Sequence, residues 1–244
     1  MSPFVQRTVR LNDGNEIPVI AFGTGTSQAW TDTSPVVSSA LSNGLIHIDS
    51  AYHYKNAKFT GDAIRNSGLH RDEFYVTTKG AAFEAEPDDF DARFYLTENL
   101  KDLGLEYVDL FLIHADILVG DVQKAWKQME ELKKEGLTRS IGVSNFSTKS
   151  LQAILDICEI PPALNQIEFH PYSLPTYLPT LLPLQAKHKI VTAAYAPLMS
   201  IVRHPNGPVD QVVLAIASAR GRGETPGQVL LLWAQQITGG VVVT

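Results

Sequence analysis

Short apolar runs alternate with amphipathic stretches along most of this chain. Eight runs suit strands that are buried on both faces, as in parallel sheets: residues 19–22, 45–49, 74–79, 107–114, 140–144, 163–169, 190–195 and 240–243. Between them, the sequence predicts helices over residues 34–43, about a dozen residues ending near 68, and residues 87–103, 121–135, 147–158, 176–188, 209–220 and 226–236. The stretch 121–135 is typical, because its apolar residues fall on one helical face.

Eight strands alternating with helices predict an α/β fold, either a closed (β/α)8 TIM barrel or an open doubly wound sheet. The strand count and a length of 244 residues favour one barrel domain spanning residues 1–244. No G-x-G-x-x-G follows the first strand, so the dinucleotide fingerprint of an open sheet is absent. We expect the barrel to be preceded by a β-hairpin, because residues 9–11 and 16–18 flank an Asp-Gly turn.

The sequence ends at Thr244, directly on the eighth apolar run. A barrel would normally continue into a further helix that covers this strand. We therefore expect the last helix and the C-terminal tail to be missing, and the outer face of the eighth strand to be bare.

Composition narrows the classes of partner. Hydrophobic residues make up 44% of the chain, which is enough for a well-packed core. The net charge is −6, which argues against nucleic acid or an anionic membrane as a partner. Cys158 is the only cysteine, which excludes an intrachain disulfide and a multi-cysteine metal site, and no metal is expected. The N-terminus has no run long enough for a signal peptide or a membrane span. We expect a cytoplasmic protein, either a monomer or a weak dimer, that acts on a small molecule.

Four polar residues stand at or just after the carboxyl ends of predicted strands, where barrels hold their active sites. They are Asp49, Tyr54, Lys79 and His114. Each one alone is more often structural, as a helix cap, a packed ring or a satisfied core residue. Together they suit proton delivery to a carbonyl oxygen: the Lys79 ammonium, paired with Asp49, would lower the pKa of the Tyr54 phenol, and a neutral His114 would orient the substrate.

These residues, with four further motifs, resemble the aldo-keto reductases. The motifs are the N-terminal hairpin, Gly142-Val143-Ser144-Asn145-Phe146, Asn165-Gln166-Ile167-Glu168-Phe169-His170-Pro171 and Ala194-Tyr195-Ala196-Pro197-Leu198. They occur in the family's order from about residue 9 to 244. The resemblance implies a barrel that binds NADPH and transfers its hydride to an aldehyde or a ketone.

The resemblance also implies roles for individual residues. Tyr54 matches the general acid, Lys79 and Asp49 the pair that tunes it, and His114 the residue that orients the carbonyl. The cofactor contacts are implied at Thr24, Asp49, Ser144, Asn145 and Gln166, with Tyr195 stacking on the nicotinamide. Trp30, Tyr52 and Phe83 stand where aromatic residues that line the substrate pocket are expected.

Two departures from the family pattern leave other functions open. Lys55-Asn56-Ala57 replaces the usual Gly-Asn-Glu after the acid, and the Pro-Lys-Ser segment that follows the eighth strand and helps hold the 2′-phosphate has no counterpart. NADH is therefore an alternative cofactor. The alternatives to a reductase are a cofactor-independent lyase, isomerase or cyclase on the same barrel, and a non-enzymatic regulatory subunit that senses redox state.

Overall fold

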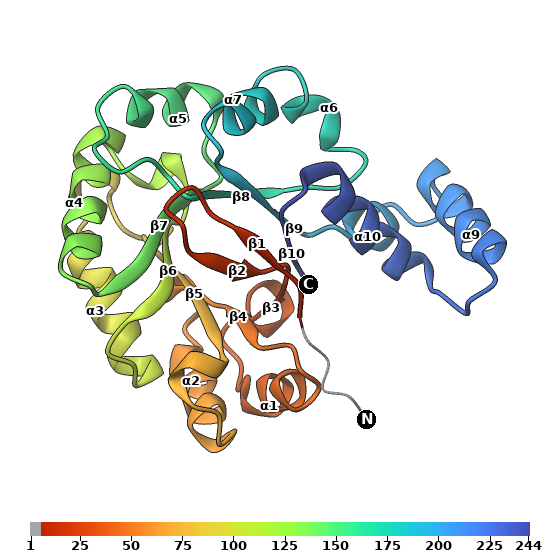
Figure 1. Ribbon diagram of the computed structural model, residues 1–244, viewed down its shortest axis with the longest axis horizontal. Helices are drawn as coiled ribbons and strands as arrows, with labels where there is room; N and C mark the ends of the chain where they lie inside the picture. Colours follow the sequence, from red (N-terminus) through yellow and green to blue (C-terminus); the bar gives the residue numbers. More distant parts are fainter. Residues whose placement is uncertain (1–5) are drawn as a thin grey trace.

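A computed structural model describes residues 6–244, and its centre is a closed barrel of eight parallel strands (Figure 1). The last strand pairs with the first, with Val243 opposite Ala21, so the ring closes. This confirms the predicted (β/α)8 barrel. In order around the ring the strands are β10 (Val241–Val243), β3 (Ile20–Gly23), β4 (His47–Asp49), β5 (Tyr75–Gly80), β6 (Val108–Ile113), β7 (Thr138–Ser144), β8 (Leu164–Glu168) and β9 (Val191–Tyr195).

A hairpin of β1 (Thr8–Arg10) and β2 (Glu16–Pro18) crosses one end of the barrel, as predicted (Figure 1). Gly14 takes a φ of +90° in its turn, a conformation that suits glycine. Leu11 and Ile17 pack with the residues inside the barrel, so the hairpin closes the amino-terminal end. The opposite end, where the strands terminate, is left for the site.

Helices surround the barrel between successive strands, because each buries an apolar stripe against the sheet. Asp121 caps the helix α4 (Val122–Lys134) by accepting hydrogen bonds from the backbone amides of Gln123 and Lys124, at 2.9 and 3.1 Å. Trp126 and Met129 of the same helix are fully buried. The helices that follow β3 to β8 and precede β9 are α1 (Ser34–Ser42), α2 (Ala57–Asn66), α3 (Ala92–Leu103), α4 (Val122–Lys134), α5 (Thr148–Leu155), α6 (Leu174–Tyr177) and α7 (Leu181–Lys187).

The continuous helix predicted over residues 176–188 is wrong. The structure has the short helix α6 and the separate helix α7 there. Pro179 lies between them and has no backbone N–H to donate, and its ring would clash with the preceding turn. Pro183 is tolerated because it lies in the first turn of α7, where the N–H has no helical partner.

The predicted helix over residues 87–103 is also divided. A short 3₁₀ turn at Pro87–Asp89 comes first, and α3 begins only at Ala92. Asp91 ends the irregular stretch by accepting a hydrogen bond from the amide of Phe94, at 3.0 Å. A capping carboxylate inside a helical pattern therefore marks a new start.

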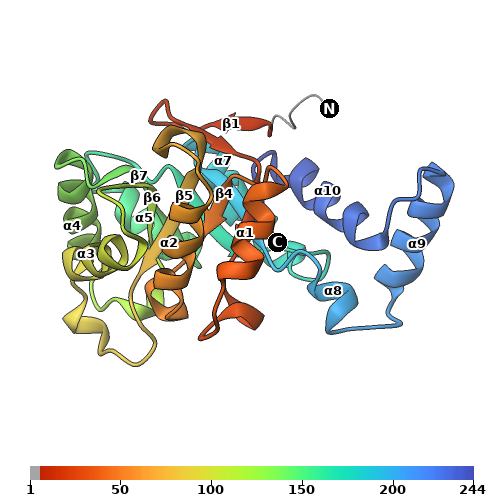
Figure 2. The ribbon, with the colours of Figure 1, turned by 90° about the horizontal axis from the view of Figure 1, so that it is seen from below.

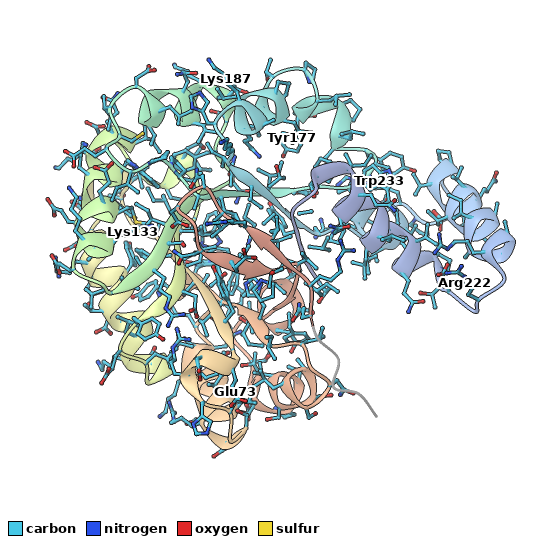
Figure 3. The ribbon with its side chains drawn as sticks, viewed as in Figure 1. Glu73, Lys133, Tyr177, Lys187, Arg222 and Trp233 are labelled. Atoms are coloured by element: carbon cyan, nitrogen blue, oxygen red, sulfur yellow. The ribbon has the colours of Figure 1, made fainter. Side chains whose placement is uncertain are left out.

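The outer face of β10 is not bare, contrary to expectation. Val242 points outward and is only 2% exposed, because α10 (Pro226–Thr238) packs against this strand. Trp233 of α10 is labelled in Figure 3, and its ring stacks on Phe169 with 5.6 Å between ring centroids.

Between β9 and α10 the chain forms α8 (Met199–Val202) and α9 (Pro208–Arg220), and α9 stands away from the barrel (Figure 2). Exposed apolar side chains gather on α9 and α10 instead of on β10: Val212, Leu214, Ile216, Leu232 and Ile237.

Candidate active site

A cavity of about 590 Å³ opens at the carboxyl ends of the barrel strands. It brings together residues that lie far apart in the sequence, as expected for this rim of a barrel. Eight of the residues predicted for the site line it: Asp49, Tyr54, Phe83, His114, Ser144, Asn145, Gln166 and Tyr195.

Lys79 and Asp49 form a buried ion pair at the base of this cavity. Asp49 is the last residue of β4 and lies opposite Thr77 in the parallel register, and Lys79 stands two residues further along β5. Alternate residues of a strand face the same side, so the Lys79 side chain can reach the Asp49 carboxylate. The Lys79 ammonium donates to Asp49 Oδ1 and to the Ser50 carbonyl at 3.1 Å, while Gln166 Nε2 donates to Asp49 Oδ2 at 2.7 Å. Burial alone would lower the pKa of Lys79, but the charge of Asp49 and the hydrogen bond to it outweigh burial, so the net effect is to raise that pKa. Lys79 therefore stays a cation inside the protein.

Tyr54 lies in the 3₁₀ turn Tyr52–Tyr54, with the Lys79 ammonium 5.3 Å from the centre of its ring. Gly25 lies against the same ring, since a Cβ there would stand only 2.6 Å from the phenol carbon. Burial raises the pKa of Tyr54, and Lys79 lowers it by a smaller amount, so the net shift is upward. The predicted effect of Lys79 is present, but the expected net decrease is wrong, because burial of the phenol dominates. Tyr54 is a protonated phenol at neutral pH.

His114 directly follows β6, and its ring centroid lies 5.6 Å from that of Tyr54. Burial, followed by the positive charge of Lys79, lowers the pKa of His114 to about 3. Among residues 6–244, no group hydrogen-bonds its Nδ1 atom. The imidazole is therefore neutral, and Nδ1 can act as a hydrogen-bond donor or acceptor, depending on the tautomer.

We expect the free energy of unfolding to fall in mild acid, because two histidines are buried. The pKa of His114 is about 3 and that of His47 about 4, both lowered chiefly by burial, whereas unfolded histidine titrates near about 6.5. Between these values the unfolded chain binds more protons, so the free energy of unfolding falls as pH drops below about 6.5, by up to about 1.4 kcal/mol per pH unit for each histidine.

Urea unfolding between about pH 6.5 and about pH 5 measures this slope. His114→Gln should remove the His114 share of it. His70→Gln, at an exposed position, is the control and should leave the slope unchanged. Equal slopes for the wild type and His114→Gln would contradict the lowered pKa.

The residues matched to carboxamide binding form a connected network on the next strands. Ser144 Oγ donates to the Gln166 carbonyl at 3.0 Å, and the Tyr195 hydroxyl donates to Asn145 Oδ1 at 2.9 Å. The amide nitrogen of Asn145 donates to the His114 carbonyl at 3.1 Å. Asn145 takes a left-handed φ of +54°, a conformation that costs free energy and is concentrated at functional sites. The network holds the flat Tyr195 ring and the side-chain amides of Asn145 and Gln166 on one wall of the cavity.

Besides Lys79 at the base, three of the predicted residues do not line the cavity: Thr24, Tyr52 and the exposed Trp30. Thr24 is fully buried beneath the cavity, and its hydroxyl donates to the Asp49 carbonyl at 3.2 Å. Tyr52 packs against Phe94 and Tyr95 of α3, so it lies on the helix side of the turn and does not line the pocket. Its place is set by the 3₁₀ turn, which sends neighbouring tyrosines in different directions.

Asn56 is a structural residue of the site that the sequence did not single out. It is fully buried, and its amide nitrogen donates to the carbonyls of Thr24 and Gln28, at 2.7 and 2.9 Å. It thereby ties the loop that contacts the Tyr54 ring to the start of α2. An asparagine just before a helix is usually a helix cap, so nothing in the sequence distinguishes this role of Asn56 from capping.

Among the helices of residues 6–244, none combines the length and the apolar character needed to cross a membrane.

Comparison with known proteins finds one family. The model of the "Aldo/keto reductase family" matches residues 19–243. An aldo-keto reductase of Mycolicibacterium smegmatis is 40% identical over 244 residues, covering 97% of this chain and 80% of that protein. The methylglyoxal reductase DkgA of Escherichia coli is 35% identical over 237 residues, covering 96% and 81%.

Comparison with solved structures finds proteins of the same kind. A crystal structure of an aldo/keto reductase from Brucella melitensis superposes with a TM-score of 0.82 at 33% identity, covering 98% of this chain and 88% of that one. The aldose reductase of Schistosoma japonicum gives the same TM-score and identity, with 97% and 81% covered.

Proposed function

The chain belongs to the aldo/keto reductase family, and we propose that it reduces an aldehyde or a ketone with NADPH, using Tyr54 as the general acid. The observation that carries this proposal is the meeting of Tyr54, the Lys79–Asp49 pair and His114 around one cavity.

The four side chains can move one proton to the substrate oxygen. His114, as a neutral imidazole, hydrogen-bonds the carbonyl oxygen and orients it, and the Tyr54 phenol gives that oxygen its proton as the C=O double bond becomes a single bond. The phenolate left behind lies next to the Lys79 ammonium, which stabilises the new negative charge. Asp49 keeps Lys79 charged and fixed in place.

The opposite wall of the cavity fits a nicotinamide ring. The Tyr195 ring offers a flat stacking surface, and Ser144, Asn145 and Gln166 offer hydroxyl and amide groups that suit a carboxamide. Bound NADPH would supply the hydride to the carbonyl carbon. We propose NADPH rather than NADH because the resemblance to the family implies NADPH.

Purified protein given NADPH and a panel of aldehydes should consume the cofactor only when a carbonyl compound is present. We expect kcat between about 1 and about 10³ s⁻¹ on the better substrates, the ordinary enzyme range. A parallel series with NADH tests the cofactor preference. Turnover that persists without any nicotinamide cofactor would favour the hypothesis of a lyase, isomerase or cyclase. A stable protein partner together with no turnover would favour the hypothesis of a regulatory subunit.

A further inference from the structure

Glu168 stands at the carboxyl end of β8, and the proposed function gives it no role. It lies opposite Tyr195 in the parallel register of β8 and β9. Gln166, two residues earlier on the same strand, lines the cavity. Because alternate residues of a strand face the same side, the Glu168 side chain faces the mouth of the barrel, next to that of Tyr195.

The Tyr195 ring crosses the end of β8. Around the barrel, β8 lies between β7 and β9. Tyr195 belongs to β9, yet its hydroxyl donates to Oδ1 of Asn145, the residue that follows β7, at 2.9 Å. The ring therefore passes over the strand end at which Glu168 stands. Burial raises the pKa of Tyr195, and the negative charge of Glu168 raises it further, as expected for a carboxylate close to a phenol.

His170 fixes the Glu168 carboxylate without cancelling its charge. The His170 ring is buried, and its Nε2 lies 3.0 Å from Glu168 Oε1. The backbone amide of Tyr172 donates to His170 Nδ1 at 3.2 Å, so Nδ1 carries no proton. The single ring proton is therefore on Nε2, which donates to Glu168, and the imidazole is uncharged. Among residues 6–244, no lysine or arginine forms an ion pair with Glu168.

The proposed reaction changes the charge of the nicotinamide ring. The ring of NADPH is uncharged. A C–H bond of that ring breaks with both of its electrons, the hydrogen forms a new bond to the carbonyl carbon, and Tyr54 gives a proton to the carbonyl oxygen. The oxidised ring is left with one positive charge. A fixed negative charge nearby lowers the free energy of the oxidised ring and leaves that of the reduced ring almost unchanged.

We propose that Glu168 is a positioning residue that favours the oxidised, positively charged nicotinamide over the reduced one at the Tyr195 ring. This inference rests on the proposed function, which supplies the nicotinamide. Glu168 does not line the cavity, so its carboxylate acts through space and not by contact with the ligand. The same charge would ease hydride transfer to the substrate, because positive charge develops on the ring during that step.

Binding of NADP⁺ and NADPH, without any carbonyl substrate, tests this role. The two cofactors carry the same phosphates and the same adenosine, so the ratio of their dissociation constants depends on the nicotinamide ring. Glu168→Gln should raise the Kd of NADP⁺ relative to that of NADPH about three- to tenfold, the effect of one charge at a half-exposed position. Fluorescence titration of the purified full chain measures both constants.

Two further variants separate charge from structure. Glu168→Asp keeps the carboxylate and should keep the ratio within about twofold of wild type. Glu106→Gln removes the same charge from an exposed position just before β6, at the opposite end of the barrel, and should leave the ratio unchanged. In Glu168→Gln the amide oxygen can still accept the His170 proton, so the loop should stay in place.

The outcomes distinguish this inference from the proposed function. An unchanged ratio in Glu168→Gln would overturn the inference alone, and so would an equal weakening of both cofactors, which is the result that a merely structural role predicts. A change in Glu168→Asp as large as that in Glu168→Gln would also overturn it. A wild-type protein that binds neither cofactor would overturn the proposed function and this inference together.

Discussion

Tyr54→Phe should lower kcat for carbonyl reduction about a thousandfold, within the range that a general acid contributes. The substitution removes the one phenolic proton that lies beside both Lys79 and His114, and leaves the ring in place. Stability should change by less than about 1 kcal/mol, because a single neutral hydroxyl is lost. Steady-state kinetics with NADPH and one good aldehyde measure the first effect, and urea unfolding the second.

Tyr52→Phe is the matched control for this experiment. Tyr52 lies in the same 3₁₀ turn, two residues away, but its ring packs on α3, so kcat should stay within about twofold of wild type. Cofactor affinity, measured by fluorescence titration, should be equal in the two variants. Full turnover by Tyr54→Phe would show that another group supplies the proton.

Residue type and position along the strands were enough to predict the barrel and its polar rim. Each parallel strand is an apolar run that ends at a change to polar residues, and Asp49, Lys79 and His114 stand at such ends. Once a barrel is inferred, geometry brings these ends together, whatever their distance in sequence. The hairpin was predictable for a local reason, its Asp-Gly turn.

What the sequence did not show depends on the direction of side chains in irregular segments. Tyr52 and Tyr54 look alike in the sequence, yet the turn directs one to α3 and the other to the cavity. His53 between them is only 13% exposed, because it packs edge to face between Trp30 and Phe83.

The direction of the Tyr54 pKa shift could not be predicted, because it depends mainly on the burial of the ring, and no local sequence pattern shows that burial. The sequence therefore predicted which residues meet, but not how charge and burial balance among them.

Lys79→Met should lower both stability and activity, for two separable reasons. Removing the ammonium leaves the Asp49 carboxylate buried with Gln166 Nε2 as its remaining side-chain donor, at 2.7 Å, and breaking a buried ion pair in this way costs about 3–5 kcal/mol. Activity should fall about 10²- to 10³-fold, because no positive charge then stabilises the Tyr54 phenolate. Urea unfolding and steady-state kinetics on the same preparation measure the two losses.

The double variant Lys79→Met with Asp49→Asn separates these effects. It no longer contains an unpaired buried charge, so most of the lost stability should return, whereas activity should stay as low as in Lys79→Met. Lys134→Met, which breaks an exposed pair with Glu159, is the control and should cost less than about 1 kcal/mol. If the double variant recovered turnover along with stability, Lys79 would act through the fold alone. If it recovered stability only, the ammonium would be required by the chemistry at Tyr54.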